Sequence, residues 1–186
     1  MALEYRYIED DLRTVIQSVS DVITPKLQIY DSKITGVHYW FGTKLEIIET
    51  LTQKSKNNTD KFQKYPLVCL FIDVDENKGV QKGNIEDLKL NMAIIYGTLN
   101  NFKAYERLEK TFKPVIMPIY FELLNQISLN GNMFLGAYPV NNIKHKIARK
   151  YRWGETPISG DNQNMIQDYV DGLELTLELK YYFNRC

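Results

Sequence analysis

Residues 173–183 read LELTLELKYYF, and leucine stands at every second position from Leu173 to Leu179. Glutamate and threonine fill the positions between the leucines. Successive side chains of a β-strand point to opposite faces of the sheet, so this period of two predicts a strand with one face on the core and the other in water. We expect this strand to be the last element of the domain.

The same period recurs earlier, from Leu88 to Ile94, and a shorter apolar stretch, YPLVCLFIDV at residues 65–74, precedes it. The alternating stretch predicts a second half-exposed strand, and the apolar one predicts a buried strand. Pro66 lies near the start of the buried strand, where a missing backbone donor is tolerated. We expect the two strands to form an antiparallel hairpin with a long tip at about residues 75–86.

Apolar residues at helical spacing predict a first helix from Tyr5 to beyond Val19, and we expect Pro25 to end it. A short helix is predicted after Thr43, because Thr43 and Glu46 have the spacing of a capping box.

Residues 105–127 carry a longer helical stripe that Pro114 and Pro118 interrupt. Each proline removes a helical hydrogen bond, so the stretch predicts either two helices or one kinked helix. Extended segments are expected at GVHYWFG (residues 36–42) and, as a strand, a bend and a further strand, within residues 133–149.

The predicted order is therefore α, β, α, β, β, α, β, β, without an internal repeat. This order indicates the α+β class, with an antiparallel sheet flanked by helices. A chain of 186 residues is expected to form a single domain spanning 1–186. We expect a flexible loop at about 52–64 and another loop at about 153–167.

The composition excludes several classes of protein. The 23 basic and 23 acidic residues cancel, which disfavours tight binding to a nucleic-acid backbone. No apolar run is long enough to span a membrane, and MALEYRYIEDD has no apolar leader, so we expect no membrane contact and synthesis in the cytoplasm. The cysteines Cys69 and Cys186 are expected to be reduced.

No residue pattern predicts chemistry. His38 and His145 are far apart and have no partner at metal-ligand spacing. Asp73, Asp75 and Asn77 resemble the start of a calcium loop, but its sixth position is a lysine and its twelfth an asparagine. We therefore expect no enzyme activity, no catalytic residue, no metal and no cofactor.

The sequence contains one basic cluster with interleaved aromatic residues. Such a cluster can follow a nucleic-acid backbone. It also suits the edge strand of a sheet, where lysines discourage pairing with other chains. The neutral chain favours the second interpretation. The cluster consists of Lys144, Lys146, Arg149, Lys150 and Arg152.

The order of several segments resembles that of ring proteins of tailed bacteriophages, of the tail-terminator and head–tail connector type, and most of all those of crAss-like phages of Bacteroidota. The resemblance covers nearly the whole chain. The segments that carry it are HYWFGTKLEIIETL (38–51), KYPLVCLFIDVDENKG (64–79), FKPVIMPIYFELLNQI (112–127), WGE (153–155) and DYVDGLELTLELKYYF (168–183).

This resemblance implies a structural virion protein that forms a closed ring at the neck or tail, twelve-fold rather than six-fold. Its implied partners are further copies of itself, the portal or neighbouring ring proteins, and DNA that passes through the channel without specific binding.

Such a ring needs two different complementary patches on each copy. We expect the C-terminal strand to supply one patch by adding to the sheet of a neighbour, through Leu179, Tyr181, Tyr182 and Phe183. We expect the hairpin tip, with Asp75, Asn77 and Lys78, to contact the adjacent ring or the channel. The alternative is a cytoplasmic domain that binds nucleic acid or a peptide.

Overall fold

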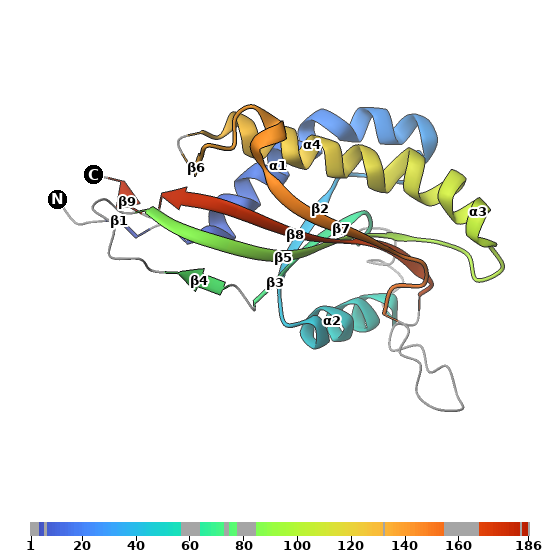
Figure 1. Cartoon of the computed structure of the whole chain (residues 1–186). Coiled ribbons are helices and arrows are strands. Elements are labelled where there is room, and N and C mark those ends of the chain that lie inside the picture. The colour runs from blue at the N-terminus through green and yellow to red at the C-terminus, as the bar shows by residue number, and fades with distance from the viewer. Residues whose placement is uncertain are drawn as a thin grey trace.

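The computed structural model of the chain describes residues 4–5, 7–56, 64–72, 75–77, 85–131, 133–154, 168–182 and 184–185. It confirms the α+β class, with a curled, mostly antiparallel sheet and helices on both of its faces (Figure 1). The strands are β1 (Glu4–Tyr5), β2 (His38–Gly42), β3 (Leu67–Phe71), β4 (Asp75–Asn77), β5 (Ile85–Gly97), β6 (Phe134–Leu135), β7 (Lys144–Lys150), β8 (Val170–Tyr182) and β9 (Asn184–Arg185). The helices are α1 (Ile8–Tyr30), α2 (Lys44–Lys56), α3 (Ala104–Arg107), the π-helical segment η1 (Leu108–Ile116), α4 (Met117–Leu129) and the short 3-10 helix η2 (Val140–Asn142).

A long antiparallel ribbon of β5 and β8 forms the middle of the sheet. Its register runs from Ile85 opposite Tyr182 to Gly97 opposite Val170. Strand β3 pairs with the other side of β5, and β2 lies outside β3. Strands β6 and β7 both pair with the other side of β8. The predicted hairpin of β3 and β5 is confirmed, whereas the parallel pairing of β2 with β3 departs from the antiparallel sheet that the sequence predicts.

Helices α1 and α4 and the segment η1 cover one face of the sheet (Figure 1). The alternating leucines of β8 point to this face and are at most 6% exposed, as their period predicts. Burying one such side chain contributes roughly 2 kcal/mol, so this layer holds most of the apolar stabilisation. The core residues of α1 that pack there include Leu12, Val19, Ile23 and Leu27.

Helix α1 continues through Pro25 to Tyr30, so the prediction that Pro25 ends the helix is wrong. A proline inside a helix costs about 3 kcal/mol. Ile23 and Leu27, on either side of Pro25, are 4% and 1% exposed, and the burial of these two residues offsets much of that cost. Packing against the sheet therefore keeps the chain helical past the proline.

The second long helical stretch is a single helical run through α3, η1 and α4 rather than two separate helices. Its middle part, η1, is π-helical and contains Pro114. Pro118 lies in the first turn of α4, where a missing N–H is tolerated. Pro114 has no N–H, so one helical hydrogen bond is missing inside η1, where the bonding pattern shifts from four to five residues.

Helix α2 packs on one end of the opposite face, over Leu67 and Cys69 of β3. The predicted capping box is confirmed: the Thr43 N–H donates to Glu46 Oε2 at 2.7 Å, and the Glu46 N–H donates to Thr43 Oγ1 at 3.2 Å. Cys69 is completely buried, which raises the pKa of its thiol.

Two loop predictions need correction. Helix α2 extends to Lys56, so the loop predicted at about 52–64 overlaps the helix, and Lys64 at its other end is 1% exposed. Strand β4 occupies residues 75–77, which the prediction placed in a hairpin tip. In the loop predicted at 153–167, Trp153 and Gly154 form a turn, and residues 155–167 lie outside the described residues.

No helix in the described part of the chain is both long enough and apolar enough to cross a membrane.

Candidate functional site

The predicted strand-addition surface at the C-terminal strand is contradicted by the sheet. Strand β8 pairs with β5 on one side and with β7 and β6 on the other. Leu179 and Tyr181 are 6% and 2% exposed, and the Tyr181 hydroxyl donates to Asp11 Oδ2 at 2.7 Å. Tyr182 is partly buried opposite Ile85, and Phe183 lies outside the described residues. Strand β8 is therefore paired on both of its sides and cannot add to the sheet of another copy.

The predicted contact residues of the hairpin tip are only partly described. Asp75 and Asn77 belong to β4, where they pair with Lys89 and Asp87 of β5. Lys78 and Asp73 lie outside the described residues. The backbone of residues 75–77 is therefore part of the sheet, not of a projecting tip.

The basic cluster lies on an open edge of the sheet. Strand β7 pairs with β8 alone among the described strands, and all seven residues from Lys144 to Lys150 are exposed. Lys144, Lys146, Arg149 and Lys150 are thus on an edge strand, as the second interpretation of the sequence predicts, and Arg152 lies in the turn that follows it. Lys150 Nζ lies 3.7 Å from Glu174 Oε2, so part of the positive charge is already balanced within the chain.

Exposed apolar side chains gather beside β7. The Tyr120 hydroxyl and His145 Nε2 are 2.6 Å apart, which joins α4 to β7, and α4 also packs against η2. We call the basic cluster together with these apolar residues the β7 edge. The apolar residues are Phe121 (60% exposed), Tyr138 (72%), Val140 (36%) and Ile147 (42%).

A second exposed apolar group lies at the opposite edge of the sheet. Phe41 of β2, Leu45 of α2 and Ile72 are each about half exposed. The Ile72 N–H donates to the Gly42 carbonyl at 3.2 Å, which holds the residue after β3 beside the end of β2. We call these three apolar residues, together with β2, the β2 edge.

The β2 edge and the β7 edge are the two outer edges of the same sheet. Paired residues lead across the sheet from His38 of β2 through Leu67, Ile95 and Gly172 to Lys150 of β7. The β2 edge and the β7 edge therefore face in opposite directions at the same level of the sheet.

The electrostatic surroundings of the two edges differ. Burial raises the pKa of Tyr39 in β2, and the nearby charges act in both directions: the carboxylates of Glu9 and Asp10 raise this pKa and the guanidinium of Arg13 lowers it, so the edge has both acidic and basic neighbours. Burial also lowers the pKa of His38, and Lys54 adds to this effect. The β7 edge instead carries lysine and arginine.

Among the described residues, no group of three or more His, Cys, Asp and Glu side chains is placed to hold a metal ion. His145 Nδ1 lies 2.8 Å from the Ile143 carbonyl oxygen and its Nε2 contacts Tyr120, so both ring nitrogens have protein partners.

Comparison with protein-family models and with curated proteins gives no match for the chain.

The apolar residues of the two edges were missed by sequence analysis. Phe41 lies in an aromatic segment and Phe121 lies within a helical stripe, so neither differs from a core residue in the sequence. Only the tertiary structure shows that Phe41 and Phe121 are exposed. The residues next to them in the chain, Gly42 and Tyr120, are buried.

Proposed function

We propose that the protein is a non-enzymatic structural component that assembles head to tail with copies of itself into a closed ring. A head-to-tail contact joins two different surfaces, and each copy must carry both of them. The observation that carries the proposal is the presence of two chemically different exposed edges at opposite ends of one row of strands.

The chemistry of the edges supports their contact. Phe41 on one edge and Phe121 on the other are exposed aromatic residues, a class that is enriched at the cores of interfaces. The basic residues of the β7 edge would meet Glu9 and Asp10, the two carboxylates that lie near β2 together with Arg13. Opposite charges at the rim fix the orientation and speed the encounter of the two surfaces.

We base the location of this ring on the resemblance of the sequence to phage ring proteins. In this proposal the ring lies in the virion neck or tail, between the portal and the neighbouring ring proteins, and it assembles in the host cytoplasm. Twelve-fold symmetry is favoured over six-fold, and DNA passes through the channel without specific binding. The balanced charge of the chain suits a channel along which DNA slides.

A second candidate function is a nucleic-acid-binding or peptide-binding domain. The observation that favours it is that all seven residues of β7 are exposed, with its lysines and arginine on a strand that pairs with β8 alone among the described strands. An added peptide strand or a phosphate backbone could use the same residues.

The test is the mass of the purified protein in solution, measured by light scattering and by negative-stain microscopy. The wild-type chain is expected to form a ring. Phe41→Asp and Ile147→Asp each place a charge in one edge, so each variant alone is expected to be monomeric. Because each variant keeps one intact edge, a mixture of the two is expected to form a heterodimer and nothing larger.

The matched control is Ile29→Asp, since Ile29 is 88% exposed on α1 and belongs to neither edge. This variant should keep the wild-type mass. A wild-type monomer at every concentration would refute the ring. Salt-dependent retention of that monomer on DNA would favour the second candidate.

A further inference from the structure

An open cleft of about 740 Å³ lies at the Gly97 end of β5, between the end of α1, the segment η1 and the residue pair that precedes β8. This volume is typical of sites for small molecules. None of the apolar residues of the two edges lines the cleft, and aromatic side chains make up one third of its lining. The aromatic residues are Tyr30, Tyr65, Tyr96, Phe102 and Tyr169.

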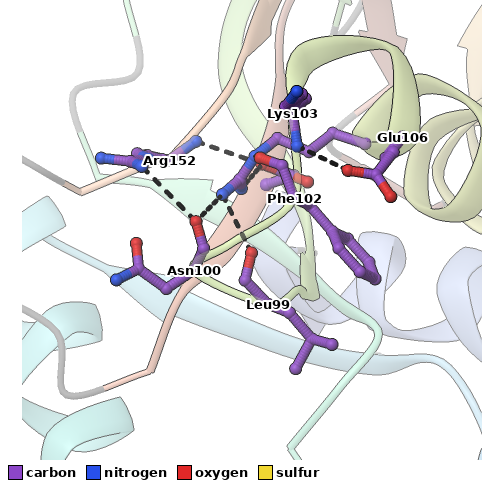
Figure 2. Close-up of polar contacts among 8 residues, drawn as sticks. Leu99, Asn100, Phe102, Lys103, Glu106 and Arg152 are labelled. Atoms are coloured by element: carbon purple, nitrogen blue, oxygen red, sulfur yellow. Dashed lines mark hydrogen bonds and ion pairs between the residues drawn. The ribbon is translucent and has the colours of Figure 1, made fainter.

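One wall of the cleft is fixed from behind by Arg107, whose side chain is 3% exposed. Its guanidinium donates to the carbonyls of Leu99, Asn100 and Phe102 at 3.0, 3.3 and 2.9 Å. Figure 2 shows these three residues around a single bend of the chain, with Arg152 on the other side of Asn100. The wall is therefore held in place before any ligand arrives, which lowers the cost of binding.

The lining of the cleft contains two hydroxyl groups without a partner. Thr111 is 1% exposed, and its Oγ1 atom makes no hydrogen bond. The Oγ1 atom of Thr98 is buried and also makes none. Both oxygen atoms lie beneath the surface of the cleft, so a ligand reaches them only where a neighbouring side chain moves. A buried polar group without a partner is unfavourable and uncommon, so a ligand that supplies the missing hydrogen bonds would favour this movement.

The charges around the cleft are largely balanced within the chain. Lys64 forms an ion pair with Asp168. Lys110 Nζ lies 3.3 Å from Glu106 Oε1. Two of the three lysines that line the cleft are thus paired with carboxylates, and an anionic ligand would have to compete with those carboxylates, so the cleft suits a neutral molecule.

The remaining hydrogen-bonding capacity favours a ligand rich in donors. The hydroxyls of Tyr30 and Tyr96 donate to the Lys110 carbonyl and to Asp31 Oδ2, at 2.6 and 2.7 Å, and so keep only lone pairs to offer. The carboxylates of Asp31 and Asp168 are acceptors as well. Saccharide hydroxyls supply such donors, and the apolar face of a sugar ring packs on aromatic rings. We infer that the cleft binds a neutral saccharide.

The experiment is a titration of the full-length protein with maltotriose and with N-acetylglucosamine, followed by amide and side-chain NMR shifts. At least one of these probes is expected to give saturable shifts at Tyr96, Thr98 and Thr111. Thr111→Val keeps the shape of the side chain but removes its hydroxyl, and it is expected to weaken binding about tenfold, the loss of one hydrogen bond.

The same variant separates binding from folding. Because Thr111→Val removes an unpaired buried hydroxyl, the protein should unfold at the same or a higher urea concentration while it binds more weakly. Thr14→Val, at an exposed position of α1, is the control and should leave the affinity unchanged. The inference is overturned if neither saccharide binds, or if uridine or inorganic phosphate binds the cleft more tightly than both.

Discussion

The Nη1 atom of Arg107 lies 2.8 Å from Oδ1 of Asp171, and the two side chains are 3% and 0% exposed. The Arg152 N–H donates to the same carboxylate oxygen at 3.1 Å. One buried carboxylate therefore connects the start of the long helical run, the turn after β7 and the beginning of β8. Removing one partner of such a pair leaves an uncompensated buried charge.

We expect Arg107→Met to lower the free energy of unfolding by about 3–5 kcal/mol, because Asp171 would stay buried without its cation. Urea denaturation followed by circular dichroism measures this change. The matched control is Lys113→Met, since Lys113 and Glu109 form an ion pair with both side chains more than half exposed. The control should change the stability by less than about 1 kcal/mol. Equal losses in both variants would contradict a special role for the buried pair.

Gly172→Ala is expected to destabilise the protein by about 1–3 kcal/mol through overpacking. A Cβ atom at Gly172 would lie 2.9 Å from the indole of Trp153, which is itself buried. Gly131→Ala is the control, because a Cβ atom there would meet nothing within 4 Å. Thermal unfolding of the two variants compares the sites directly, and an unchanged melting temperature for Gly172→Ala would show that Trp153 moves aside at little cost.

Pro25→Ala is expected to raise the free energy of unfolding by about 1–3 kcal/mol. Alanine restores the N–H that the helix lacks at this position and removes the clash of the proline ring with the preceding turn. The side chain of Pro25 is exposed, so the substitution leaves no cavity. Chemical denaturation measures the gain. A loss of stability would mean that the proline acts mainly by restricting the unfolded chain.

Stability is expected to fall with acid below about pH 6.5 because of His38. Burial, with a smaller effect of Lys54, lowers the pKa of His38 from its ordinary value of 6.5. As the pH falls through that value, the unfolded chain binds a proton before the folded chain does, so stability decreases until the pH reaches the pKa of the folded state.

The variant His38→Gln should remove this dependence. Its stability should change less between about pH 7 and pH 5 than that of the wild type, while the two curves run parallel above about pH 7. Urea denaturation at a series of pH values gives both curves. The same slope in both proteins below pH 7 would exclude His38 as the source.

Much of the fold can be predicted from the sequence, because local pattern and tertiary structure agree. Three local patterns each predicted an element that the structure contains. The period of two in residues 173–179 predicted β8, the capping box at Thr43 predicted α2, and the apolar stretch at residues 65–74 predicted β3. These signals depend on neighbours within a few residues, which a sequence displays directly.

The failed predictions involve contacts between distant residues. Pro25 remains in a helix because Leu27 packs against the core. Strand β8 is interior because β7, which precedes it, returns along its free side. The cleft was not predicted at all, since Tyr30, Tyr96 and Thr111 come from separate elements and have no common pattern in the sequence.

The pairing of β1 with β9 places Glu4 opposite Arg185. The first and the last described strands of the chain therefore lie side by side (Figure 1). The ribbon of β5 and β8 is about 40 Å long, at roughly 3.3 Å per residue. It separates the pair of β1 and β9 from the cleft. A fluorophore attached at position 4 or at position 185 would thus occupy nearly the same place, remote from Arg107.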